Sequence, residues 1–198
     1  MRLIAHRGLW DENIKDNSYE ALKKGLESDK YIGIECDIRV TRDNKFIIYH
    51  NILYKGELIK NKIYSKLKDI PLLEDILKIS SDKLYLLELK DFNMDLDKLL
   101  KLLDKYKRNI YIMSFDLNIL KSLKKLSNKY KIGVLNYVFN SESDYNLDFI
   151  CLLDVVATNR VIDYYESKNI EVIIYGVNSV KRNLTYIVDD RKLNDKIN

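Results

Sequence analysis

The sequence predicts an α/β fold, a closed (β/α)8 barrel (TIM barrel) with a short insertion after the second strand. Short β-branched or aromatic runs alternate with longer amphipathic runs along the 198 residues, and eight of the short runs are strand candidates. Such alternation is typical of parallel βαβ units, and a count of eight strands favours a closed barrel. An open doubly wound sheet is the alternative. We expect a single domain over residues 1–198, at the small end for a barrel.

The expected strands are runs rich in β-branched and aromatic residues. They are Arg2–Ala5, Tyr31–Asp37, Leu84–Leu89, Ile110–Ser114, Ile132–Tyr137, Val155–Thr158, Glu171–Tyr175 and Thr185–Val188. The expected helices lie between these strands and have apolar residues at helical spacing. They are Ser18–Ser28, Leu73–Ile79, Asp95–Tyr106, Leu117–Lys129, Glu142–Phe149, Val161–Ser167 and a short piece after Asn178.

One stretch, about residues 38–70, interrupts the alternation. Two β-rich runs flank Asp43-Asn44, and the second run ends at His50. An Asp-Asn pair between two such runs predicts a hairpin turn. The segment Ile52–Asp69 has many charged and few large apolar residues, so we expect it to be a thin, solvated loop.

Composition and charge exclude several classes of protein. The net charge is +4, and the lysines are scattered through amphipathic runs, which is typical of solvated helix faces and not of a nucleic-acid interface. Cys36 and Cys151 lack metal-site spacing and are expected to be buried thiols. No stretch has the length of a membrane span or a signal-peptide core. We expect a cytoplasmic protein with no nucleic-acid partner and no stable membrane association; the oligomeric state is left open.

Polar side chains stand where the first three expected strands end. His6 and Arg7 follow the first strand, Glu35 and Asp37 end the second, and Glu88 and Lys90 end the third. In a parallel barrel these ends form the active-site face. Alternate residues of a strand share a side, so Glu35 and Asp37 point together while Cys36 points towards the helices.

Three convergent carboxylates, Glu35, Asp37 and Glu88, make an oxygen-rich cage that suits Mg²⁺ or Ca²⁺. Without a cation or Lys90 to offset them, their charges would repel. Each feature alone has a simpler interpretation, as surface decoration, an ion pair on a strand or a core histidine. Co-occurrence favours a site, because the two histidines of the chain, His6 and His50, both end β segments beside the cage.

The motifs in order resemble the glycerophosphodiester phosphodiesterase family. They are His6-Arg7-Gly8, Asp16-Asn17-Ser18, Glu35-Cys36-Asp37, Thr41-Arg42-Asp43, Tyr49-His50, Ile70-Pro71-Leu72-Leu73-Glu74-Asp75, Glu88-Leu89-Lys90, Ser114-Phe115-Asp116, Val177-Asn178 and Ile187-Val188-Asp189. Asp16 stands where the family usually has glutamate, Asn51 where it has aspartate, and Tyr175-Gly176 where it has Trp-Thr. The segment between the second histidine and the next helix is also shorter than in the family.

The resemblance implies a (β/α)8-barrel enzyme that hydrolyses small glycerophosphodiesters to glycerol phosphate and an alcohol. It implies metal ligands at Glu35, Asp37 and Glu88 and acid–base histidines at His6 and His50. Arg7 and Lys90 would bind the substrate phosphate, since positive charge must surround its oxygens.

Asn17 and Tyr175 are supporting candidates, the first orienting the site and the second lining the substrate pocket. The family is thought to use the glycerol 2-hydroxyl as first nucleophile, giving a cyclic phosphate that water then opens. Two alternatives are a phospholipase-D-like or phospholipase-C-like enzyme acting on lipids and a non-catalytic phosphate-binding domain. The short Ile52–Asp69 segment leads us to expect broad tolerance of the leaving alcohol.

Overall fold

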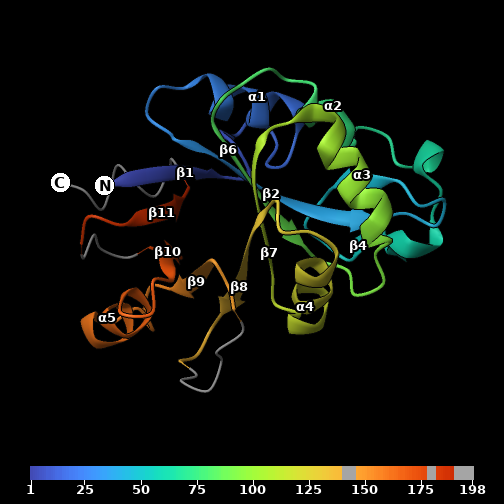
Figure 1. The fold of residues 1–198 in the computed structure, drawn as a ribbon. Coiled ribbons are helices and arrows are strands. Elements are labelled where there is room, and N and C mark those ends of the chain that lie inside the picture. The colour runs from blue at the N-terminus through green and yellow to red at the C-terminus, as the bar shows by residue number, and fades with distance from the viewer. Residues whose placement is uncertain (140–145, 178–181, 190–198) are drawn as a thin grey trace.

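Eight parallel strands form a closed barrel in the computed structural model, which describes residues 1–139, 146–177 and 182–189. β1 (Arg2–His6) pairs with β2 (Gly33–Val40) on one side and with β11 (Thr185–Val188) on the other, which closes the sheet. The remaining parallel strands are β6 (Leu84–Leu89), β7 (Asn109–Ser114), β8 (Lys131–Asn136), β9 (Phe149–Leu153) and β10 (Glu171–Tyr175). Figure 1 shows the first strand, in blue, beside the last, in red. The predicted closed barrel is confirmed.

Strand alternation divides the apolar side chains between two cores. One fills the inside of the barrel, with members such as Ile4, Leu86 and Met113. The other lies between the strands and the helices and contains Ile34 and Cys36 of β2. Because Cys36 faces the helices, its neighbours Glu35 and Asp37 face the barrel interior, as the sequence predicts. Cys36 and Cys151 are free and buried, as expected.

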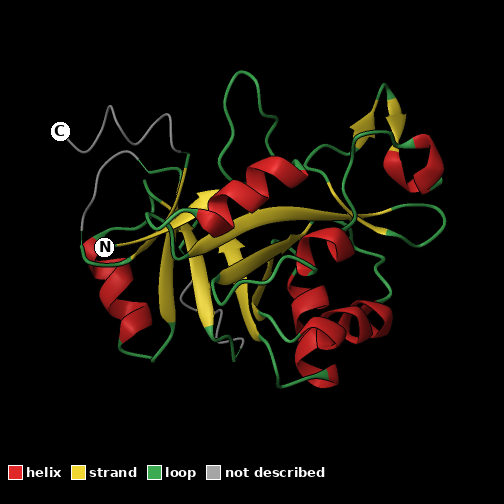
Figure 2. Ribbon diagram, turned by 90° about the horizontal axis from the view of Figure 1, so that it is seen from above, coloured by secondary structure: helices red, strands yellow, loops and turns green. Residues whose placement is uncertain are grey.

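Five α-helices occur among the described residues, and Figure 2 shows them around the outside of the strands. They are α1 (Tyr19–Glu27), α2 (Leu73–Leu77), α3 (Leu96–Tyr106), α4 (Leu117–Leu126) and α5 (Asn159–Glu166). Each overlaps an expected helix. Four begin where a side-chain oxygen accepts a backbone N–H of the first turn, from Ser18, Asp95, Asp116 and Thr158.

The insertion after β2 begins with the predicted hairpin, because β3 (Phe46–Ile48) runs antiparallel to β2. It continues through a second hairpin of β4 (Leu53–Tyr54) and β5 (Glu57–Leu58) and two 3₁₀ turns, η1 (Ile59–Asn61) and η2 (Tyr64–Lys66). These elements stand at one edge of the molecule (Figures 1 and 2).

The expectation of a thin, solvated loop over Ile52–Asp69 is wrong. Most of its charged side chains are exposed, although Lys62 is partly buried. Ile59 and Leu67 are buried against Ile47 of β3 and Ile70, with four partly buried side chains packed on them. A few well-spaced apolar residues suffice to fold a short segment when a strand such as β3 supplies the rest of the core.

The sixth parallel strand is the main error in the predicted elements. It is β9 (Phe149–Leu153), not Val155–Thr158, and Val155 is 68 % exposed. The chain turns after Leu153, whose carbonyl accepts N–H groups from Val156 and Ala157. The apolar run enters the barrel and Asp154 ends it. Asn159, which directly follows the expected strand Val155–Thr158, begins α5 instead.

Two expected helices, Glu142–Phe149 and the short piece after Asn178, are not found among the described residues. The end of the expected helix Glu142–Phe149 is wrong, since residues 146–148 are not helical and Phe149 begins β9. Its first part, over residues 142–145, lies outside the described residues. The start of the short helix expected after Asn178 also lies outside the described residues. The residues that follow it in the description, 182–184, are not helical. Within the described ranges, no helix is both long and apolar enough to cross a bilayer.

Candidate active site

Three carboxylates meet inside the mouth of the barrel. Glu35 and Asp37 of β2 and Glu88 of β6 are 2 %, 1 % and 8 % exposed, and one oxygen of each lies within 4.8 Å of the others. The register explains this grouping, because Asp37 is paired directly with Glu88 in the parallel β2–β6 ladder. Alternation then turns Glu35 to the same side as Asp37.

Two cations compensate part of this negative charge. Lys90 Nζ lies 2.6 Å from Glu88 Oε1 and 3.4 Å from Asp37 Oδ1, and Arg7 Nε lies 3.2 Å from Asp37 Oδ2. Burial alone would raise the pKa of Asp37, but Lys90 and Arg7 hold it below its ordinary value. Burial raises the pKa of Glu88, and Lys90 opposes that shift.

Glu35 is the carboxylate with the least compensation. Burial, together with the charges of Asp37 and Glu88, raises its pKa well above the ordinary value. Its Oε1 is buried, with no hydrogen-bond partner among the described residues. Buried polar atoms are normally satisfied, and hard divalent cations prefer carboxylate oxygens. The residues therefore fit Mg²⁺ or Ca²⁺, with Glu35, Asp37 and Glu88 as the available ligands.

His6 ends β1 and faces the same cluster. Its Nδ1 lies 2.7 Å from Asp189 Oδ1, and its Nε2 lies 3.8 Å from Glu35 Oε2. Asp189 directly follows β11, the strand paired with β1. Asp189 was not among the predicted site residues; its place at the end of the last strand is the signal that could have found it.

The turn after His6 depends on its glycine. Arg7 and Gly8 both have positive φ angles, 57° and 81°. A Cβ at Gly8 would lie 2.4 Å from backbone atoms of Ala21 in α1, so no other residue fits there without a shift. The turn directs the Arg7 backbone N–H to Glu35 Oε2 at 3.2 Å, and Arg7 Nη1 donates to Asp16 Oδ2 at 2.9 Å.

Asn17 is tied to the carboxylate cluster. Its Nδ2 donates to Asp37 Oδ2 at 2.7 Å, and its Oδ1 accepts the backbone N–H of Asp37 at 3.3 Å. The residue is buried and has a positive φ of 57°, a conformation that asparagine tolerates better than most residues. Its side chain thus holds Asp37 in place by two hydrogen bonds.

His50 follows β3, and Arg39 holds its backbone. Arg39 Nε and Nη2 donate to the carbonyl oxygen of His50 at 3.0 and 2.8 Å, while Arg39 Nη1 contacts Asp91 Oδ1 at 2.5 Å. The imidazole Nδ1 lies 3.1 Å from Asn51 Oδ1. Burial lowers the pKa of His50, although the Asn51 contact opposes that shift.

Arg39 and Asp91 were also missed from the sequence. Arg39 is two residues beyond Asp37 on β2, which places it on the same side as Glu35 and Asp37. Strand alternation could therefore have identified Arg39. The pairing of Arg39 with Asp91, which follows β6, depends on the tertiary structure and leaves no pattern in the sequence.

A cavity of about 220 Å³ opens over the cluster. His6, His50, Glu35, Glu88 and Lys90 line its polar part. Its apolar wall contains the predicted Tyr175 and a stacked aromatic pair, Phe115 and Tyr137, whose ring centroids are 4.6 Å apart. Seven of the nine predicted site residues line this cavity, and the other two, Asp37 and Asn17, are bonded to each other in the adjoining cluster.

Comparison with known proteins relates both the sequence and the fold of this chain to one family. Residues 6–60, which carry His6, Arg7, Glu35, Asp37 and His50, match the model of the Glycerophosphoryl diester phosphodiesterase family. No curated protein matches the chain.

Solved structures are similar over nearly the whole chain. An Oleispira antarctica phosphodiesterase, solved with the product sn-glycerol-3-phosphate, has a TM-score of 0.83 at 16 % identity, over 100 % of this chain and 96 % of that one. A glycerophosphodiester phosphodiesterase from Thermotoga maritima has a TM-score of 0.79 at 21 % identity, over 99 % and 97 % of the two chains. One from Parabacteroides distasonis has a TM-score of 0.80 at 21 % identity, over 96 % and 92 %.

The resemblance of this chain to the glycerophosphodiester phosphodiesterases is therefore confirmed, in sequence over residues 6–60 and in fold over nearly its whole length.

Proposed function

We propose that this chain is a glycerophosphodiester phosphodiesterase that depends on a divalent cation, releasing glycerol phosphate and an alcohol. The observation that carries the proposal is the buried cluster of Glu35, Asp37 and Glu88 with His6 and His50 beside it at the mouth of the barrel. The match of residues 6–60 to the family model supports the same reaction. The cytoplasmic location expected from the sequence stays a prediction.

The proposed substrate phosphate lies between the carboxylate cluster and the two histidines. A divalent cation, Mg²⁺ or Ca²⁺, held by Glu35, Asp37 and Glu88 would supply positive charge to the phosphate in the transition state. Arg7 and Lys90 add positive charge from the protein itself. Both now contact carboxylates, so each would bridge between the cluster and the phosphate oxygens.

His6 and His50 are proposed to transfer the protons. One accepts the proton of the attacking hydroxyl, and the other gives a proton to the departing alcohol oxygen. Asp189 fixes the His6 ring by accepting at Nδ1, which leaves Nε2 directed to the cluster side, where Glu35 lies. Arg39 and Asn51 fix the backbone and ring of His50.

Hydrolysis of glycerophosphocholine by the purified chain, with and without a chelator, tests the reaction. We expect activity that is lost on chelation and restored by Mg²⁺ or Ca²⁺. Replacement of a ligand, as in Glu35→Gln, Asp37→Asn or Glu88→Gln, should weaken metal binding strongly. His50→Ala should lower kcat by roughly 10²–10⁴. Full activity after exhaustive chelation would contradict the metal dependence, and a lack of hydrolysis of every glycerophosphodiester would contradict the reaction.

A lipid substrate is the second candidate, and one observation favours it. Tyr137 is 59 % exposed and Phe115 39 %, and this stacked pair forms part of the cavity wall, where an acyl chain could lie. The comparison is kcat/KM for glycerophosphocholine against a micellar lysophospholipid. We expect the soluble diester to be preferred; a preference for the micellar lipid of more than about tenfold, or roughly 1.4 kcal/mol, would favour the phospholipase-like alternative.

A further inference from the structure

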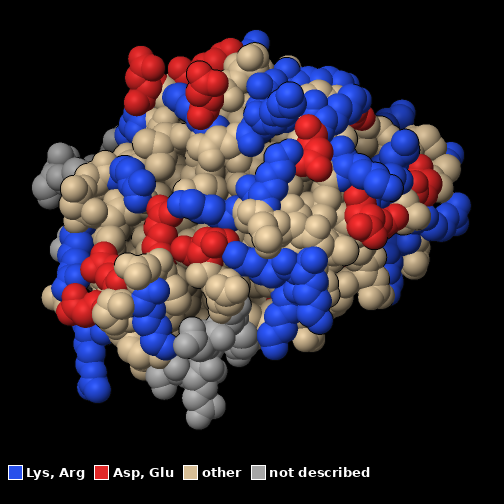
Figure 3. Space-filling model, in the orientation of Figure 1, with Lys and Arg blue, Asp and Glu red and all other residues tan. Residues whose placement is uncertain are grey.

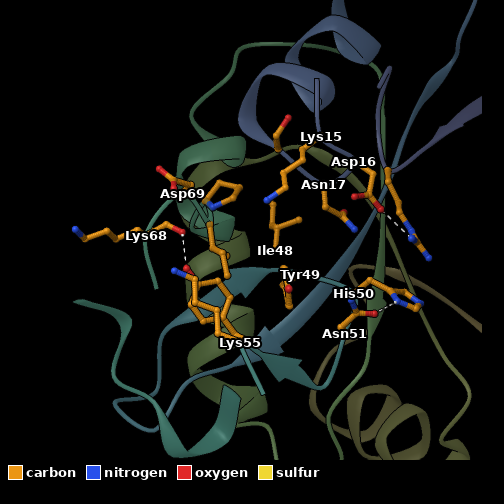
Figure 4. A pocket seen from close by; sticks show the side chains of 15 residues that line it. Lys15, Asp16, Asn17, Ile48, Tyr49, His50, Asn51, Lys55, Lys68 and Asp69 are labelled. Carbon is orange, nitrogen blue, oxygen red and sulfur yellow. Dashed lines mark hydrogen bonds and ion pairs between the residues drawn. The ribbon is translucent and has the colours of Figure 1, made fainter. Parts of the chain in front are cut away.

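A second cavity, of about 410 Å³, adjoins the first at His50 and Arg7, which line both. Its walls come from the loop before α1, from the end of β3 and from the insertion, including Tyr54, Lys55 and the segment 68–71. Figure 4 shows these three segments facing one another. A phosphodiester at His50 and Arg7 therefore has room for one of its two alcohols in each cavity.

The second cavity is basic. Four basic residues line it, Arg7, Lys15, Lys55 and Lys68, against Asp16 and Asp69, and Asp16 is already bonded to Arg7. Within the described part of the chain, no carboxylate pairs with any of the three lysines. Figure 3 shows Lys and Arg on the molecular surface over α2 and α3 of Figure 1, with acidic side chains among them. An anionic group would therefore be attracted here.

The individual lysines differ in where they lie. Figure 4 shows Lys15 extending towards Ile48, whereas the side chain of Lys68 extends outward. Lys55 Nζ lies 5.4 Å from the centroid of the Tyr54 ring, so it already occupies the aromatic face that a quaternary ammonium group would need. The arrangement favours an anion over choline in this cavity, with Lys15 and Lys55 as its main contacts.

We propose that the second cavity binds a phosphate group carried by the leaving alcohol. The substrate class is then a soluble glycerophosphodiester whose second alcohol bears a phosphate monoester. This inference rests on the proposed function, because the first phosphate must bind at His50 and Arg7. Near neutral pH the monoester carries close to two negative charges, and lysine ammonium groups bind such a group as point charges.

A matched pair of substrates tests the proposal. Glycerophosphoglycerol and the same molecule phosphorylated on its terminal hydroxyl differ only in the second phosphate. We expect kcat/KM to be about tenfold higher for the phosphorylated substrate at low salt, since two partly solvated ion pairs are each worth only a few-fold. The preference should shrink as salt is added, because the lysines are exposed. Glycerophosphocholine, with a cationic alcohol, should be the poorest of the three.

Substitution of the lysines tests whether the preference for the phosphorylated substrate arises in the second cavity. Lys15→Gln and Lys55→Gln should each reduce the preference for the phosphorylated substrate, and the double variant should bring it close to one. Lys23→Gln serves as the matched control, because Lys23 is an exposed lysine of α1 that pairs with Glu27 outside the cavity; it should keep the full preference.

The outcomes separate this inference from the proposed function. Equal kcat/KM for the two matched substrates, or a preference that survives in the double variant, would overturn the inference while the hydrolase activity stands. If the wild-type chain hydrolyses none of the three diesters, the proposed function fails and the inference fails with it.

Discussion

Arg39 holds His50 by its backbone, since two nitrogens of one guanidinium donate to the same carbonyl oxygen, at 3.0 and 2.8 Å. Asp91 completes the arrangement: Oδ1 pairs with Arg39 Nη1 and Oδ2 accepts the backbone N–H of Val40. Arg39 is buried and contacts neither cavity. Arg39 therefore positions His50 through its backbone and leaves the imidazole free to line both cavities.

Arg39→Lys should lower kcat by about tenfold and change KM little, because lysine has one nitrogen and cannot donate twice to the His50 carbonyl. Losses of 10–100-fold are usual for residues that orient a functional side chain. Steady-state kinetics on glycerophosphocholine would measure kcat and KM of the variant separately. Arg42→Lys, at an exposed arginine of the same hairpin, is the control and should match wild type. A rise in KM with unchanged kcat would show that Arg39 acts on substrate binding instead.

His6 and Asp189 should behave as one unit. Asp189→Asn removes the charged acceptor of His6 Nδ1, so we expect kcat to fall by at least about tenfold. His6→Ala should cost roughly 10²–10⁴ in kcat. Because Asp189 acts through His6, the double variant should be little worse than His6→Ala alone. Multiplicative losses in the double variant would mean that Asp189 acts independently of His6.

Addition of Mg²⁺ or Ca²⁺ to the metal-free chain should raise its melting temperature. A cation at about one hundred times its Kd stabilises a protein by about 2.7 kcal/mol, which is roughly 5–10 °C for a chain of this size. Glu35→Gln should abolish this shift, since it removes the carboxylate whose Oε1 has no hydrogen-bond partner among the described residues. Without metal, the same variant should melt no lower than wild type, because it relieves repulsion with Asp37 and Glu88.

Glu12→Gln is the control for that thermal experiment, because Glu12 is exposed and lies outside the cluster. It should keep the full shift with metal. If Glu35→Gln retains the metal-induced shift as well, Glu35 is not a ligand, and the cluster is stabilised by Lys90 and Arg7 without a cation.

The backbone at Asn17 gives a test of stability. Asn17→Ala and Asn17→Gly both lose the two side-chain hydrogen bonds to Asp37, but only alanine is strained at a φ of 57°. The left-handed conformation costs a residue with a Cβ about 1 kcal/mol. Thermal melts should therefore place the alanine variant about 2–4 °C below the glycine variant. Equal melting temperatures would indicate that the turn relaxes when the amide is lost.

The sequence predicted the barrel and the cluster because both depend on local patterns. Alternation along β2 places Glu35 and Asp37 inside and Cys36 outside, and each polar residue follows an apolar run. The sixth strand was wrong because the run Phe149–Leu153 is also compatible with the end of a helix, and only its place in the barrel decides. Contacts between distant segments, such as Arg39 with Asp91, have no local pattern at all.

The insertion is a second case in which contacts between distant residues could not be predicted from the sequence. Its charged residues led us to expect a solvated loop, and most of its lysines are exposed, although Lys62 is partly buried. What the sequence could not show is that Ile59 and Leu67 pack on Ile47 and so fix the segment beside His50. The second cavity exists because of that packing, and no run of residues within the segment indicates it.

The pairing of β1 with β11 makes the geometry of the site depend on a segment that is synthesised late. His6 meets Asp189 across 183 positions of sequence, and β1 and β11 form the seam that brings them together. A ribosome that has released β1 through β10 has already made every candidate metal ligand and both histidines. The His6 ring still has no acceptor at Nδ1 until β11 emerges and the seam closes. The His6 ring is therefore oriented only after β11 has joined β1, and a chain cut short before Asp189 would lack this acceptor.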